Sequence, residues 1–283
     1  MTGIIEKARN PVNLLDFAGV CPYNFCDMRA RFAVLTALLV GSLSLAGCGF
    51  VSDLFSQRAQ PLLPAADLYA AGEAELNKRR FEDARVNFRK IVERHPQSSY
   101  AARARFLVGE AFYREGEFNK AITEFEAFLA FFPRHEIADL VQFRLAMSYY
   151  DQMKPVEQDQ GITKKAEEQF RKLVRDYPDS RYASDALSKI ERCRGQLAQK
   201  EVWVAAWYLD KGNRVAARQR LESVLKDYAR SLVIPEALFR LGEIYAADGR
   251  AQDAQATWQR LAGEYPFTEW GRRASQRLRT AAR

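Results

Sequence analysis

Residues 81 to 96 read FEDARVNFRKIVERHP and contain a phrase that returns along the chain. The phrase is an alanine (Ala84), an aromatic residue four positions later (Phe88) and a proline eight positions after that (Pro96). Two further copies keep all three residue types, one copy has lost the aromatic residue and the proline, and the last has tryptophan as its aromatic residue. These four copies are Ala121/Phe125/Pro133, Ala166/Phe170/Pro178, Ala217/Leu221/Ala229 and Ala254/Trp258/Pro266.

A pair of antiparallel helices explains this spacing. Twelve positions before the alanine, three of the copies carry a glycine: Gly72, Gly109 and Gly242. Small residues let two helices approach closely, a large apolar residue fills the space between them, and proline ends the second helix. This is the signature of tetratricopeptide repeats, whose ideal period is about 34 residues. The steps here are 37, 45, 51 and 37 residues, so the junctions are longer. We predict an all-α solenoid of about five helix hairpins with a C-terminal capping helix.

A second phrase, Pro-x-Ser/Thr-x-aromatic, follows three of the repeats. The copies are Pro96/Ser98/Tyr100, Pro178/Ser180/Tyr182 and Pro266/Thr268/Trp270. Because serine and threonine hydroxyls accept hydrogen bonds from the free N–H groups at helix starts, we expect them to cap the next helix.

The pattern also predicts where helices begin and end. Repeat one should have helices near 67–78 and 81–94, and repeat two should span 102–134. Repeat three begins near Asp139 and carries about eight extra residues within 153–162, which Pro155 and Gly161 should keep as a loop. One long or only slightly broken helix is expected over 182–208, turns at 211–213 and 248–249, a fifth repeat after Pro235, and a capping helix over 269–279.

An export signal precedes the repeats. From Met28 the chain has two arginines, then an apolar run over 32–43 that is too short to span a membrane, then Leu45-Ala-Gly-Cys48. The last four residues resemble the lipobox of bacterial lipoproteins, which implies that Cys48 is lipidated and becomes the first mature residue. Gly49, where inner-membrane lipoproteins of this kind usually have aspartate, favours the outer membrane. The alternative is an ordinary signal peptide cut near the same place.

The N-terminal segments divide accordingly. Residues 1–27 are interpreted as an extra N-terminal segment upstream of Met28, where translation is expected to begin. Residues 28–47 are interpreted as the signal peptide and residues 48–64 as a lipidated tether. Cys21 and Cys26 would then be absent from the protein, and they lack nearby histidines for a metal site. Cys193 is expected to be a small buried apolar residue.

Charge and motifs exclude several classes of function. The net charge is +7 for the whole chain and +6 for residues 48–283, with basic and acidic residues mixed along helix faces, as in 164–168. That pattern is typical of solvated helices, so nucleic acid is not expected as a partner. The two histidines, His95 and His135, accompany no nucleophile, phosphate loop or metal motif. We expect a scaffold without enzymatic activity, metal or cofactor, apart from the lipid on Cys48.

Residues that recur on the first helix of each hairpin should line the concave face of the solenoid. Two sets recur at a spacing of 37 residues, and a pair of tyrosines accompanies them. The predicted peptide-binding residues are Tyr69, Phe106 and Phe143, Asn77 and Arg114 (with Asp151 in the same register), and Tyr113 and Tyr150. The alternative is that these aromatic residues form the core between repeats. For Tyr113, Arg114 and Tyr150 we favour the groove.

Two runs outside the repeat pattern carry a more specific resemblance. They are LVRDYPDSRY at 173–182 and QLAQKEVWVAAWYL at 196–209. Through them, the chain from Cys48 onward resembles the BamD-type, or ComL-type, outer-membrane assembly lipoproteins. The resemblance implies a lipid-anchored protein on the periplasmic face of the outer membrane that helps the BamA barrel and accessory lipoproteins to fold barrel proteins. Repeats within 65–178 would receive the C-terminal signals of unfolded barrels, and 179–283 would dock on BamA's periplasmic domains.

The resemblance also implies a docking contact. The family's Arg-Leu/Val-Glu run, which opens the second helix of repeat four and communicates with BamA, matches Arg220-Leu-Glu222. The preceding residues and the missing proline depart from the family pattern. The competing interpretation is another periplasmic scaffold, such as a Tol-Pal associated or pilus-assembly lipoprotein. The former usually adds a coiled coil before its repeats, and no heptad stretch occurs here.

Overall fold

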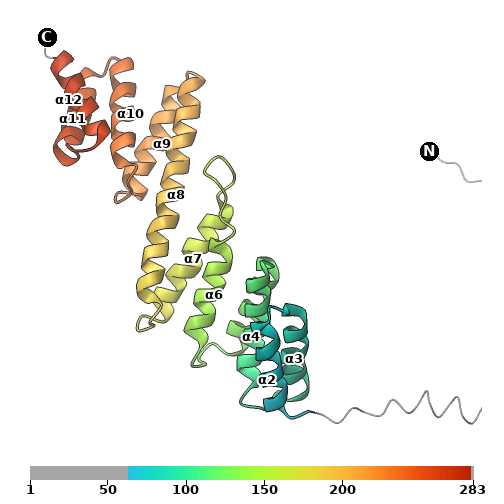
Figure 1. Cartoon of the computed structure of the whole chain (residues 1–283). Coiled ribbons are helices and arrows are strands. Elements are labelled where there is room, and N and C mark those ends of the chain that lie inside the picture. The colour runs from blue at the N-terminus through green and yellow to red at the C-terminus, as the bar shows by residue number, and fades with distance from the viewer. Residues whose placement is uncertain (1–62, 282–283) are drawn as a thin grey trace, which may run out of the picture. The chain divides into compact units, whose positions relative to one another are not determined.

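The computed structural model describes residues 63–281, which form eleven helices and no strand (Figure 1). This confirms the predicted all-α fold. The helices, in chain order, are α2 (Ala65–Asn77), α3 (Phe81–Arg94), α4 (Ala101–Glu115), α5 (Phe118–Phe131), α6 (Ala138–Tyr150), α7 (Gly161–Asp176), α8 (Ala183–Asp210), α9 (Arg214–Asp227), α10 (Ile234–Ala247), α11 (Ala251–Glu264) and α12 (Glu269–Ala281). The predicted signal peptide, Cys48 and most of the predicted tether lie outside the described residues.

The two helices of a hairpin touch where the sequence has its glycines. A Cβ atom added to Gly72 would lie 2.5 Å from Phe88 Cε1, and one added to Gly109 would lie 2.6 Å from Phe125 Cε1. Gly242 meets the indole of Trp258 in the same way. These distances are too short for any side chain, so the predicted close approach of the helices is confirmed.

Helix α8 joins two parts of the hydrophobic core. Near its start, Ile190 and Cys193 are buried in a cluster with residues of α6 and α7. Near its end, Val202 and Ala205 are buried in a second cluster with α9, α10 and α11. The helix has 28 residues, and a Cβ added to Gly195 near its middle would meet no atom within 4 Å. The single long helix predicted here is confirmed.

Two helix starts differ from the prediction. Helix α7 begins at Gly161, so this glycine does not keep its segment a loop. The buried amide of Gln160 instead holds the loop, because it donates to the carbonyl oxygens of Lys154 and Pro155, while its oxygen accepts from Thr163. Helix α10 begins before Pro235, which is tolerated in a first turn because no intrahelical partner is needed there.

The hydroxyl caps are confirmed at one junction of three. Thr268 Oγ1 accepts from the Gly271 N–H at 3.0 Å, directly before α12. Ser98 and Ser180 accept from N–H groups two residues later, at 3.2 and 3.1 Å, before α4 and α8 begin. The prediction is wrong for these serines, which close the turn between helices and do not cap the helix.

Candidate functional site

The ends of α4 and α6 meet on the side formed by the first helices of repeats two and three. The Tyr113 hydroxyl donates to the Asp151 carboxylate, and the Arg144 guanidinium lies 5.2 Å from the centre of the Tyr113 ring. Burial and the hydrogen bond to Asp151 raise the pKa of Tyr113, so its hydroxyl stays protonated and remains a donor at neutral pH. We call the surface of Tyr113, Arg114, Tyr150 and Asp151 the α4–α6 face.

The buried carboxylate of Glu110 binds the Arg114 side chain. Its Nε donates to Glu110 Oε1 at 2.8 Å, and Arg144 Nε lies 2.9 Å from Glu110 Oε2. The Glu110 side chain is 3% exposed, whereas that of Arg114 is 46% exposed. Two guanidinium groups thus share one buried carboxylate, and with the Asp151 carboxylate on the same face the four charges balance.

The aromatic set at a spacing of 37 residues packs the two helices of each hairpin together, and two of its members also touch the start of the next repeat, Tyr69 at Tyr100 and Phe143 at Tyr182, each with ring centres 5.0 Å apart. Tyr69 is half-buried and meets Phe88 edge-on, with ring centres 5.8 Å apart. Phe106 stacks on Phe125 at 5.9 Å. Phe143 is 8% exposed, so its ring belongs to the core rather than to a groove. Asn77 is exposed at the end of α2, and no hydrogen bond within 63–281 links it to the α4–α6 face.

The proposed docking residues lie on α9. Arg220 is in the middle of this helix and does not open it, because α9 begins at Arg214. Its Nη1 donates to Glu201 Oε2 of α8 at 3.0 Å, with the Arg220 side chain 47% exposed. Glu222 accepts from the Tyr245 hydroxyl of α10 at 3.2 Å. Both residues therefore connect α9 to a neighbouring helix while remaining at the surface.

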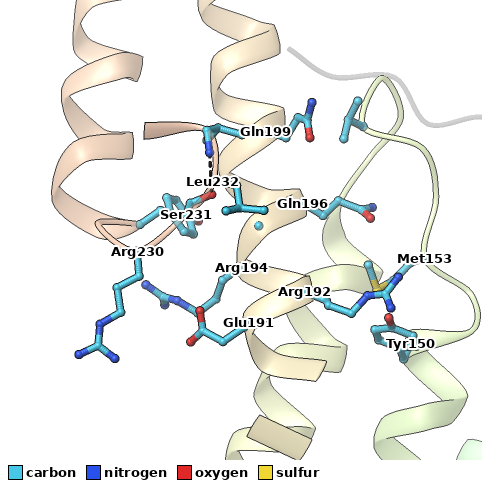
Figure 2. A pocket seen from close by; sticks show the side chains of 14 residues that line it. Tyr150, Met153, Glu191, Arg192, Arg194, Gln196, Gln199, Arg230, Ser231 and Leu232 are labelled. Atoms are coloured by element: carbon cyan, nitrogen blue, oxygen red, sulfur yellow. Dashed lines mark hydrogen bonds between the residues drawn. The ribbon is translucent and has the colours of Figure 1, made fainter. Parts of the chain in front are cut away.

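A cavity of about 480 Å³, not predicted from the sequence, opens between the α6–α7 loop, α8 and the α9–α10 loop (Figure 2). We call it the junction cavity. Its lining includes apolar, amide and arginine side chains, with Tyr150 shared with the α4–α6 face. The lining residues are Tyr150, Met153, Val156, Glu191, Arg192, Arg194, Gly195, Gln196, Gln199, Tyr228, Arg230, Ser231, Leu232 and Val233.

The sequence contained one signal of this cavity. Its two loop walls are the places where the repeat pattern is broken: the extra residues before α7, and the junction at Ala229 that has lost its proline. Gln196 links the α6–α7 loop to helix α8. Its side-chain amide donates to the Lys154 carbonyl at 2.6 Å and to Gln160 Oε1 at 2.7 Å.

Comparison with known proteins supplies the family. A model of the YfiO family, described as "Outer membrane lipoprotein", matches residues 62–261. The chain belongs to the YfiO family. No helix within residues 63–281 has both the length and the apolar character needed to cross a membrane.

Relatives of this YfiO-family chain include proteins named outer membrane protein assembly factor BamD. The outer membrane protein assembly factor BamD of Caulobacter vibrioides is 30% identical over 247 residues, which cover 86% of this chain and 79% of the relative. BamD of Rickettsia prowazekii is 29% identical over 237 residues, covering 84% and 93%. Among solved structures, a tetratricopeptide repeat protein of Thermus thermophilus has 18% identity and a TM-score of 0.34, covering 75% of this chain and 98% of that one.

Proposed function

We propose that this protein is a non-catalytic assembly factor for outer membrane barrel proteins, working with BamA and accessory lipoproteins in the cell envelope. The observation that carries the proposal is the YfiO family match over residues 62–261, together with relatives that are named assembly factors and are similar over most of their length. A repeat scaffold suits this work, because stacked helix pairs offer long surfaces for other chains.

The α4–α6 face is proposed to receive the C-terminal signal of an unfolded barrel protein. Such a signal presents an aromatic side chain and a carboxylate on an extended strand. The face offers the half-buried Tyr113 ring beside the exposed cation of Arg114, which supports the assignment. Aromatic anchors supply much of the binding energy in such contacts.

The surface of α8 and α9 is proposed to dock on the periplasmic domains of BamA. Arg220 contacts Glu201 of α8, whereas the two large exposed aromatic side chains of α8, Trp203 (39% exposed) and Trp207 (48% exposed), lie on another face of that helix and would extend the contact area around it. Tryptophan and arginine are enriched among residues that dominate protein interfaces. Their position on the C-terminal repeats leaves the α4–α6 face to the substrate.

A lipid on Cys48 is proposed to anchor the protein to the outer membrane, with residues 49–64 as its tether.

Co-purification tests the proposed function in barrel assembly. The full chain, extracted with mild detergent, should bring down BamA, and the Tol-Pal or pilus-assembly proteins should be absent. Recovery of either alternative set without BamA would refute the proposal.

A further inference from the structure

The charges of the α4–α6 face are already matched to one another. Arg114 and Arg144 share the buried carboxylate of Glu110, and Asp151 brings a second negative charge to the same face. A barrel signal ends in a residue that carries both an aromatic side chain and the terminal carboxylate. The cation that receives this carboxylate should therefore come from a neighbouring element and lie beside an aromatic ring of the face.

Helix α8 brings two cations to Tyr150, at the edge of the α4–α6 face. Lys189 Nζ lies 4.6 Å from the centre of the Tyr150 ring. Arg192 lines the junction cavity with Tyr150, and Figure 2 shows its side chain directed toward this tyrosine, across the cavity from Arg230. The side chains of Lys189 and Arg192 form no ion pair or hydrogen bond with any residue of 63–281. A cation on an aromatic ring keeps its charge and its N–H donors, so both side chains can bind a carboxylate.

Three acids lie around this pair of cations, and only one of them counts against it. Asp151 belongs to the balanced set of the α4–α6 face. Glu191 is directed toward Arg194, on the side of α8 away from Tyr150 (Figure 2). Asp185 does act on Tyr150, but it lies in the first turn of α8, where the helix dipole offsets part of a negative charge. Two cations against one acid leave a positive charge beside Tyr150.

An apolar surface for the last side chain adjoins these cations. The Tyr150 ring is fixed by an edge-on contact with Phe170, with ring centres 6.0 Å apart, and Met153 lines the junction cavity beside it. Tyr113 of α4 is bonded to Asp151, the next residue after Tyr150. Alternate residues of an extended chain point to the same side and lie about 6.6 Å apart. The last side chain can therefore lie on Tyr150 while the side chain two positions earlier lies on Tyr113.

We propose that Lys189 and Arg192 form the subsite for the C-terminal carboxylate of a barrel signal, with the last aromatic side chain on Tyr150 and Met153. This inference rests on the proposed function of the α4–α6 face and commits to a chain end as the occupant. Only a chain end places a backbone carboxylate and an aromatic side chain on one residue. Helix α8 thus completes the substrate site near its start and carries the proposed docking surface near its end.

The probe is acetyl-Gly-Val-Asn-Tyr-Ser-Phe, made once with a free terminal carboxylate and once as the terminal amide. Each form is titrated by calorimetry into the full chain in mild detergent. The unaltered protein should bind the acid about tenfold more tightly than the amide, because hydrogen bonds to a charged group contribute more than those to a neutral one. Equal binding of the two forms would overturn the subsite and leave the aromatic contacts of the α4–α6 face standing.

The variant Lys189→Gln/Arg192→Gln should bind the acid only as tightly as the amide and should bind the amide as the unaltered protein does. A packing role alone would weaken both forms alike. Lys165→Gln is the matched control, because Lys165 Nζ lies 5.7 Å from the ring centre of Tyr149, the neighbouring tyrosine of α6. It should keep the preference for the acid.

A preference for the acid that survives in the double variant would overturn the subsite. Failure of both peptide forms to bind the unaltered protein would refute substrate binding at the α4–α6 face and the subsite with it. Co-purification with BamA does not depend on either peptide, so failure of the subsite and failure of the proposed assembly function are distinguishable.

Discussion

Small residues set how closely the helices of each hairpin approach. Gly72, Gly109 and Gly242 lie under an aromatic ring, and Ala146 and Ala205 are completely buried at the corresponding positions of repeats three and four. These contacts were predictable because the glycine and the aromatic residue recur sixteen residues apart. The aromatic ring packs directly on the backbone at the glycine. A larger residue in place of the glycine would therefore push the two helices apart.

Gly109→Ala should therefore destabilise the protein although alanine favours helices. Its Cβ would lie 2.6 Å from Phe125 Cε1, and overpacking of this kind costs about 1 to 3 kcal/mol. Gly195→Ala is the control, because its Cβ would meet nothing, and it should stabilise by about 0.5 to 1 kcal/mol. Urea unfolding followed by circular dichroism measures both. Equal effects of the two changes would contradict the packing argument.

Cys193 illustrates a buried thiol without chemistry. The sulfur is fully buried, and burial, with a contribution from Glu167, raises its pKa from 9.0 to about 12. The thiol stays protonated in the folded state, so its contribution to stability is complete below pH 9 and is lost as the pH rises toward 12. We expect Cys193 to resist iodoacetamide at neutral pH and to react in concentrated guanidinium. Peptide mass spectrometry measures this, and rapid labelling of the folded protein would disprove it.

At the scale of helices, repeat spacing and proline positions predicted the element order well. The start of α7 was missed because a buried glutamine, Gln160, fixes that loop, and glutamine is no turn signal. The junction cavity was missed because its walls come from loops far apart in the sequence, where the repeat is broken. The sequence could not show whether Phe143 lies in the groove or in the core. Residues that recur every 37 positions can form either an exposed row on the concave face or a buried row between helices.

Docking through α9 can be tested at Arg220. Arg220→Glu should leave the helical melting curve nearly unchanged, because exposed ion pairs contribute about 0 to 1 kcal/mol. It should weaken binding to the periplasmic domains of BamA by about 2 to 5 kcal/mol, the usual cost of losing one partner of an interfacial charge pair.

The double reversal Arg220→Glu/Glu201→Arg controls for the pairing with α8, where the two side chains lie 3.0 Å apart. It restores opposite charges across the two helices. Docking should stay weak in this variant if Arg220 contacts BamA itself. Recovery of binding would mean that Arg220 only holds α9 against α8.

Substrate binding through α4 can be tested at Tyr113. Tyr113→Ala should weaken binding of a barrel-signal peptide at least tenfold, about 1.4 kcal/mol, while BamA binding persists. Fluorescence anisotropy with a labelled peptide measures this, and the same peptide without its terminal aromatic residue is the reference. Tyr150 is left intact because it also lines the junction cavity. Normal peptide binding by the variant would remove the α4–α6 face from consideration.

At the scale of the whole molecule, the family and the repeats describe a scaffold, and the predicted lipid anchor would decide where it works. The mature chain should begin at an acylated Cys48, because a basic head, an apolar run and Leu45-Ala-Gly-Cys48 occur in register. Mass spectrometry of the membrane-extracted protein measures the N-terminus. Cys48→Ala should release the protein from membranes. An unmodified N-terminus upstream of Cys48, or firm membrane retention of the variant, would contradict the prediction.

The order of helix contacts has a consequence for how this chain acquires its structure. Each helix packs mainly on the helices next to it in sequence, and the further contacts, between α4 and α6 and between α10 and α12, skip a single helix. Loop closure over short distances costs little entropy, and chains with local contacts fold within microseconds to milliseconds. Neighbouring hairpins can therefore fold together once their own residues are available, without waiting for the C-terminus.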